Sequence, residues 1–115
     1  MRTVYICHPY SDDPARNVAR VREICRSIAG DDLLPVAPHL FLPQFVDDAT
    51  SRDLAMVMCL RLVDACDSIA VIGREITAGM RQEIDHAEAT AKPIIYVPTP
   101  DTVADARTLA RRAKI

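Results

Sequence analysis

Aromatic residues are scarce in this chain, and neither sign of charge dominates it. Aromatic side chains make up 4% of the sequence and tryptophan is absent, so we expect a core of aliphatic side chains. The formal net charge of -2 provides no basic field for a nucleic-acid backbone, and we expect no nucleic acid polymer as a partner. No apolar run approaches the roughly 20 residues that cross a bilayer, so we expect no membrane span.

Paired-cysteine motifs are also missing. The four cysteines form no CxxC pair and none has zinc-like spacing from a histidine. We therefore predict reduced thiols that pack as small apolar side chains, with no metal site and no cofactor. The opening stretch MRTVYICHPY reaches His8 and Pro9 too soon for the apolar core of a signal peptide, so a cytoplasmic protein is expected.

Hydrophobic periodicity, by contrast, is strong and alternates between two kinds of element. Apolar runs predict four strands, at residues 3–7, 33–37, 68–73 and 92–98. Apolar positions at helical spacing predict four helices, at residues 14–29, 52–65, 79–91 and 100–114. Such alternation is typical of a parallel sheet with helices on both faces. We predict one α/β domain over residues 1–115, with a doubly wound, flavodoxin-like parallel sheet of four to five strands.

The carboxyl ends of parallel strands meet at one edge of a sheet, where ligands bind. The polar residues that follow the strands should gather there: His8 and Tyr10 after the first strand, His39 and Gln44 after the second, and Thr77, Gly79 and Glu83 after the third. His8 could instead cap the end of its strand, and Tyr10 could pack within its loop rather than stack on a base. His39 and Gln44 could hold the long loop 38–51 by backbone hydrogen bonds. Arg16 and Asn17 could meet a phosphate near the start of the first helix or simply face solvent.

Glu83 has the most informative position among these candidates. It lies within about one turn of the start of the predicted helix 79–91, where the helix dipole stabilises negative charge by roughly 0.3–1 kcal/mol. We therefore expect an ionised carboxylate. On a helical wheel Glu83 borders the apolar stripe of Met80, Ile84 and Ala87, so it should be sheltered without being buried. An ordinary surface acid could occupy the same position.

Taken together, the segments VYICHPY, CDSIAVIG, TAGMRQEIDHA and KPIIYV resemble the nucleoside 2-deoxyribosyltransferase-like superfamily, and within it a group of small bacterial and phage proteins. In that superfamily an aspartate and an apolar strand precede a Ser/Thr-x-Gly-x-x-x-Glu turn into a helix. Thr77, Gly79 and Glu83 match this turn, and Asp67 stands sixteen residues before the glutamate. The resemblance covers most of the chain and implies that Glu83 is a nucleophile.

The activity implied by the resemblance is cleavage of the N-glycosidic bond of a nucleoside or nucleotide, or deoxyribosyl transfer. In family enzymes an acid precedes the nucleophile by roughly two dozen residues, where this chain has Cys59. Asp47, Asp48 and Asp53 are the acids that could replace it. The alternative is a non-catalytic module that binds a nucleotide or a nucleotide-derived signal, and a NAD-cleaving domain comes third. Whether the chain is an enzyme stays open.

The predicted helix 52–65 is apolar over much of its circumference. One face carries Leu54, Val57, Met58, Leu62 and Ala65, and further apolar residues surround it. A helix with two apolar faces in so small a domain needs a second cover. We therefore predict a homo-oligomer in which another copy of the chain covers this helix.

Overall fold

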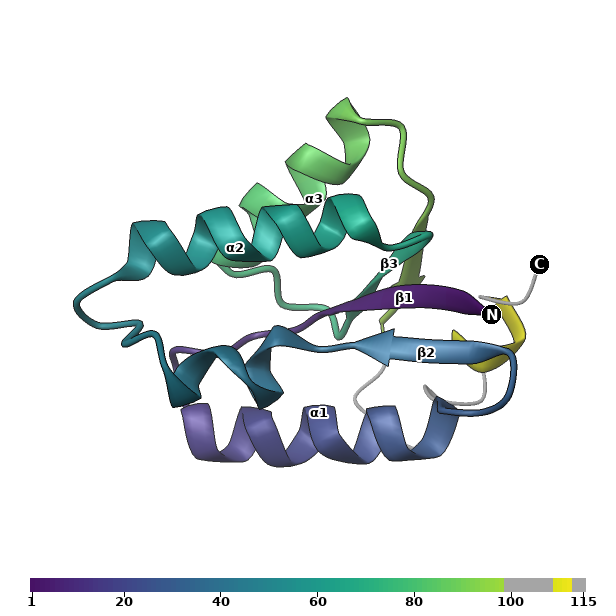
Figure 1. The fold of residues 1–115 in the computed structure, drawn as a ribbon, viewed down its shortest axis with the longest axis horizontal. Helices are drawn as coiled ribbons and strands as arrows, with labels where there is room; N and C mark the ends of the chain where they lie inside the picture. Colours follow the sequence, from purple (N-terminus) through teal and green to yellow (C-terminus); the bar gives the residue numbers. More distant parts are fainter. Residues whose placement is uncertain (99–108, 113–115) are drawn as a thin grey trace.

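A four-stranded parallel sheet forms the centre of the computed structural model, which describes residues 1–98 and 109–112 (Figure 1). The strands are β1 (Arg2–Cys7), β2 (Leu33–Val36), β3 (Ser68–Ile72) and β4 (Ile94–Val97). Their order is β2-β1-β3-β4, and every neighbouring pair is parallel. The predicted parallel α/β fold is confirmed, and each strand end lies within two residues of its predicted position.

Helices cover both faces of this sheet, as expected for a doubly wound fold (Figure 1). The helix α1 (Pro14–Ile28) packs on one face, whereas α2 (Arg52–Ala65) and α3 (Ala78–Ala89) pack on the other. Because β2 and β3 lie on opposite sides of β1, the loops after β1 and β3 separate and leave room for a ligand between them. Residues 109–112 are helical, and the rest of the predicted helix 100–114 lies outside the described residues.

Alternation along β1 divides the core between the two faces. Val4 and Ile6 belong to an aliphatic cluster with α1, whereas Tyr5 and Cys7 belong to the cluster on the opposite face with Met80. This division follows from the pleat of a strand, in which successive side chains point to opposite faces. Tyr5 and Cys7 therefore face the same side of the sheet as α3.

The start of α3 differs from the prediction. Thr77 is the N-cap, and its side-chain oxygen accepts a hydrogen bond from the backbone N–H of Met80 at 3.2 Å. The helix consequently begins at Ala78 and ends at Ala89, one residue earlier and two residues earlier than expected. Glu83 is the sixth helical residue and lies in the second turn, further from the helix start than predicted.

The long loop between β2 and α2 is largely ordered by two short 3-10 helices, η1 (Pro38–Leu40) and η2 (Leu42–Gln44). Leu42 and Val46 are buried, which accounts for the apolar character of this loop. The helix η1 packs against α1. The loop therefore forms a fixed wall beside the carboxyl edge of the sheet.

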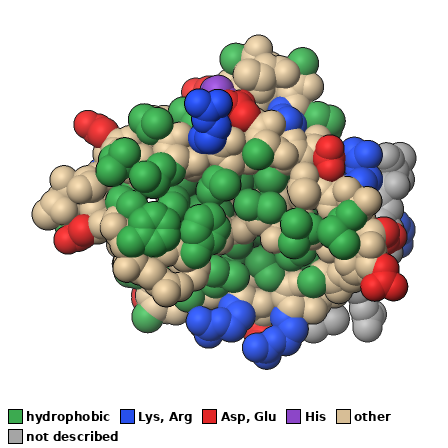
Figure 2. Space-filling view, in the orientation of Figure 1, with side chains coloured by type: hydrophobic (Ala, Val, Ile, Leu, Met, Phe, Trp, Pro, Cys, Tyr) green, Lys and Arg blue, Asp and Glu red, His purple; other side chains and the backbone are tan. Residues whose placement is uncertain are grey.

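The helix α2 is only partly covered by the rest of the chain. Val63 is its one buried residue, whereas Leu54 and Val57 are 50% and 65% exposed. Phe45, in the loop before α2, is 67% exposed. Hydrophobic side chains gather across the centre of the face drawn in Figure 2, which carries α2 and the two 3-10 helices. None of the helices in the described ranges is long and apolar enough to cross a membrane.

Candidate functional site

A cavity of about 240 Å³ opens at the carboxyl edge of the sheet. The loop after β1, the loop before α2, α2 itself and the first half of α3 form its walls. It brings together six of the predicted site residues: His8, Tyr10, His39, Thr77, Gly79 and Glu83. Gln44 does not line this cavity. Its side-chain amide donates to the Leu40 carbonyl at 2.9 Å. Gln44 therefore holds the loop 38–51 by a backbone hydrogen bond, which was the alternative to a place in the site.

Glu83 lines the cavity, yet it is only 7% exposed. The Tyr5 hydroxyl donates a hydrogen bond to Oε2 of Glu83, and the Cys7 thiol donates to Oε1 at 3.5 Å. Both donors come from β1, whose alternate residues face α3. Neither Tyr5 nor Cys7 is among the site residues that the sequence predicts. The strand period of two, combined with the position of β1 next to β3, is the signal that could have identified them.

The protonation of Glu83 differs from the expectation drawn from the helix dipole. Burial raises the pKa of Glu83 to about 7, although the hydrogen bonds from Tyr5 and Cys7 act in the opposite direction. The expected position, sheltered without being buried, is therefore wrong, and the carboxyl group is partly rather than fully ionised at neutral pH. A helical wheel describes α3 alone, whereas in the fold the neighbouring strand β1 covers the carboxyl group. The dipole effect also fades beyond the first turn.

The two donors stay protonated at neutral pH. Burial raises the pKa of Tyr5 well above its usual value, and the nearby Glu83 carboxyl raises it further. Burial and then Glu83 raise the pKa of Cys7 in the same way. Glu83 is thus a carboxyl group near its titration midpoint at neutral pH, held by two neutral donors.

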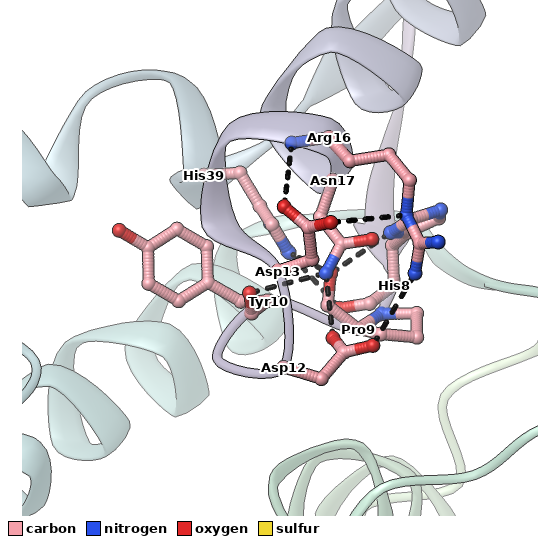
Figure 3. A network of polar contacts seen from close by, with 8 residues as sticks. All are labelled: His8, Pro9, Tyr10, Asp12, Asp13, Arg16, Asn17 and His39. Atoms are coloured by element: carbon pink, nitrogen blue, oxygen red, sulfur yellow. Dashed lines mark hydrogen bonds and ion pairs between the residues drawn. The ribbon is translucent and has the colours of Figure 1, made fainter.

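The turn between β1 and α1 is fixed by polar contacts to the first residues of α1 (Figure 3). Buried Asn17 donates through Nδ2 to the Tyr10 carbonyl at 3.1 Å and to Oδ1 of Asp12 at 2.7 Å. Arg16 contacts Asp12 at 3.5 Å and Asp13 at 3.8 Å. Asn17 therefore shapes the turn that presents Tyr10 to the cavity.

Two histidines connect this turn to the loop before α2 (Figure 3). Nε2 of His39 lies 2.9 Å from the His8 carbonyl and 3.1 Å from the Pro9 carbonyl, so it carries the proton. The His39 ring meets the rings of His8 and Tyr10 edge-on, at 5.9 Å and 5.3 Å between centroids. Burial lowers the pKa of both histidines, so they are neutral at pH 7. His39 thus pins the loop and also lines the cavity.

Only one of the three replacement acids reaches the cavity. Asp48 lines it and accepts hydrogen bonds from the Ser11 hydroxyl at 3.0 Å and from Nη2 of Arg52 at 3.2 Å. Asp47 instead accepts from the backbone N–H of Ala49, and Asp53 is an exposed residue of α2 away from the cavity lining. Asp48 is therefore the candidate proton donor.

Cys59 occupies the position where the family pattern calls for an acid. It lines the cavity from α2, and burial raises its pKa to about 11. Cys59 is therefore a neutral thiol at physiological pH.

Thr77, Gly79 and Asp67 carry the rest of the family pattern. Thr77 lines the cavity but uses its hydroxyl oxygen as the N-cap of α3. A Cβ added at Gly79 would lie 3.5 Å from Cε of Met56, which is ordinary contact, so packing does not require glycine there. Asp67 lies at the opposite edge of the sheet and accepts from the backbone N–H of Thr3 at 2.8 Å. Its role is to join the starts of β1 and β3.

A family model described as a domain of unknown function (DUF7768) matches residues 2–97. This span includes all four strands, α1 to α3 and every residue that lines the cavity. No curated protein and no solved structure matches the chain. Within the described ranges, no group of three or more His, Cys, Asp or Glu side chains could hold a metal ion.

Proposed function

The chain belongs to the family described as a domain of unknown function (DUF7768), and this description names no activity. We therefore propose an activity from the residues that line the first cavity. In this proposal the protein binds a nucleoside or nucleotide and cleaves its N-glycosidic bond, or transfers its deoxyribosyl group, through Glu83. The observation that carries the proposal is the carboxyl group of Glu83, buried in a cavity wall and held by two donors. The resemblance to the nucleoside 2-deoxyribosyltransferase-like superfamily supports the same assignment.

The proposed reaction begins with the ionised form of Glu83. Its carboxylate attacks the anomeric carbon while the C–N bond breaks and the electron pair leaves with the base, which gives a glycosyl ester on Glu83. Water, or a second base, then resolves this ester. Tyr5 and Cys7 fix the orientation of the carboxylate, which places the attacking oxygen without further reorganisation.

The departing base needs a proton and a surface to bind against. Asp12 and Asp48 both line the cavity. We assign the proton transfer to Asp48, because the hydrogen bond from Asn17 lowers the pKa of Asp12. The ring of Tyr10 and the apolar side chains of Leu42 and Met56 line the same cavity and offer contacts to a planar base. No cofactor is needed for this chemistry.

A second candidate function is binding without turnover. The neutral thiol of Cys59 at the family's acid position favours it, because a thiol with a pKa of about 11 is a poor proton donor to a leaving base. The protein would then hold a nucleotide or a nucleotide-derived signal in the same cavity.

Base release from a panel of nucleosides, 5′-monophosphates and NAD separates the two functions. For an enzyme, chromatography detects the free base, and Glu83→Gln lowers the rate by roughly 100-fold or more. Glu88→Gln is the matched control, since Glu88 is an exposed residue of α3. Thermal stabilisation by a nucleotide without base release supports the binding module. If no compound in the panel is cleaved or stabilises the protein, both functions are wrong.

We also propose that a second copy of the chain covers α2. Leu54 and Val57 of α2 and Phe45 in the loop before it are exposed. Hydrophobic side chains gather across the face that carries α2 (Figure 2). A cytoplasmic location is part of the proposal, and the four free cysteines agree with a reducing compartment.

A further inference from the structure

A second cavity, of about 490 Å³, lies beside the first at the carboxyl edge of the sheet. It opens on the α1 face. Its lining combines three arginines, Arg16 and Arg20 of α1 and Arg74 of the loop after β3, with two acids, Asp12 and Glu75. His8 and Asp12 line both cavities. The two cavities are therefore neighbours across the turn after β1, where the strand order reverses and ligands of doubly wound folds bind.

The arginines of the second cavity differ in their partners. Arg16 pairs with Asp12 and Asp13 (Figure 3). Arg20 and Arg74, by comparison, form no ion pair and no hydrogen bond with any residue that the structure describes. Two guanidinium groups are thus available to an anion at the wall of one concave surface.

The placement of Arg20 is unfavourable for α1 itself. Arg16 and Arg20 are one helical turn apart, and like charges at this spacing repel each other. Arg16 lies in the first turn of α1, where the helix dipole disfavours positive charge, whereas Arg20 lies beyond that turn. An anion bound between Arg20 and Arg74 would relieve this repulsion.

We propose that the second cavity binds the phosphate or diphosphate group of the ligand whose sugar faces Glu83. This inference rests on the proposed function and narrows its ligand to a phosphorylated nucleoside. Arg20 and Arg74 supply charge-assisted hydrogen bonds to the phosphate oxygens, a geometry that guanidinium groups favour. His8 lines both cavities, so it lies between the sugar and the phosphate of the proposed ligand. Its Nδ1 atom lies 2.9 Å from the Pro9 carbonyl.

Calorimetric titration of the purified protein at low ionic strength tests this proposal. The probes are the common nucleosides, their 5′-monophosphates and inorganic pyrophosphate. The variants are Arg20→Gln and Arg74→Gln, with Arg22→Gln as the matched control, because Arg22 is an exposed residue of α1 outside both cavities. We expect a monophosphate to bind more tightly than its nucleoside, and each cavity variant to weaken only the phosphorylated ligand, by roughly tenfold.

Two results overturn the phosphate site while leaving the proposed function intact. One is equal affinity of the wild-type protein for a nucleoside and its monophosphate, and the other is an Arg22→Gln effect as large as that of Arg20→Gln. If no nucleoside or nucleotide binds, the proposed function fails. The pyrophosphate titration then tests by itself whether the second cavity binds an anion. Pyrophosphate binding that Arg20→Gln removes would keep an anion site there, whereas no pyrophosphate binding would exclude it.

Discussion

Glu83 is an ionisable residue whose carboxylate charge is poorly solvated because its side chain is buried. Its pKa of about 7 lies above the ordinary value of 4.5, so the folded chain keeps a proton that the unfolded chain releases. The stabilisation from this proton is complete below about pH 4.5 and is lost as the pH rises to about 7. We expect the free energy of unfolding of the wild-type protein to fall by on the order of 3 kcal/mol across that window.

Glu83→Gln removes the titrating group, so this component of the pH dependence should disappear. Urea unfolding at pH 5 and pH 8 measures the difference, and the variant should be the more stable protein at pH 8. Glu88→Gln, with its exposed side chain, should keep the wild-type profile. Parallel profiles for Glu83→Gln and the wild-type protein would show that the carboxyl group is ionised in the folded state.

The hydroxyl of Tyr5 stabilises the ionised form of Glu83, since its hydrogen bond lowers the pKa of that carboxyl. Tyr5→Phe should therefore move the titration of Glu83 upwards, by roughly 1 pH unit. Base release as a function of pH, or NMR titration of the carboxyl carbon, measures the shift. Tyr96→Phe is the control, because the Tyr96 side chain is exposed on β4. An unchanged midpoint in Tyr5→Phe would mean that this hydrogen bond does not act on the carboxylate.

The sequence identifies Glu83 but gives its environment incorrectly, and the reason is physical. A helical wheel describes one element, whereas burial is decided by the neighbouring strand β1, which supplies both Tyr5 and Cys7. Gln44 illustrates the opposite case. It follows a strand and lies on the expected side, yet a local bond to the Leu40 carbonyl keeps its amide away from the cavity.

At the scale of elements, the two glycines of the β3–α3 segment should respond differently to alanine. Gly79 lies in the first turn of α3, and its added Cβ would make only ordinary contact with Met56. Gly79→Ala should therefore stabilise the fold by about 0.4–1 kcal/mol. Gly73 directly follows β3 and has a φ of +89°, which an L side chain rarely adopts, so Gly73→Ala should destabilise the fold by about 1–2 kcal/mol.

Thermal unfolding of both glycine variants provides the measurement. A destabilised Gly79→Ala would contradict the packing described around α3. Nucleotide affinity is a second readout of the same variant. A stabilised Gly79→Ala that binds its ligand weakly would indicate that the backbone at Gly79 approaches the ligand closely.

The elements were predictable because their signals are local. Asp13 and Pro14 mark the start of α1, and the boundaries of α2 agree with the predicted range 52–65. The sequence pattern places the start of α3 one residue late, at Gly79, whereas Thr77 caps the helix and Ala78 is its first residue. The 3-10 helices of the loop 38–51 have no periodic signal, since each is only one turn long.

At the scale of the whole molecule, the carboxyl edge of the sheet holds two cavities of different chemistry. The strand order separates the loops after β1 and β3 at this edge. Because side chains alternate along β1, the donors Tyr5 and Cys7 meet Glu83 on the face covered by α2 and α3. Which arginines share the second cavity depends on α1 and the loop after β3 together. Sequence patterns within one helix or one strand do not show which residues of different elements share a cavity.

Val57 tests whether the apolar face of α2 holds a second copy of the chain. It is 65% exposed in mid-helix, so Val57→Glu should change the fold little while placing a charge in the proposed interface. Sedimentation at micromolar concentration should show an oligomer for the wild-type protein and a dissociation constant raised by about tenfold or more for Val57→Glu. Ala19→Glu, at an exposed position of α1, adds the same charge elsewhere and should leave assembly unchanged. A wild-type protein that sediments as a monomer would refute the second copy and leave the apolar face of α2 open to another cover.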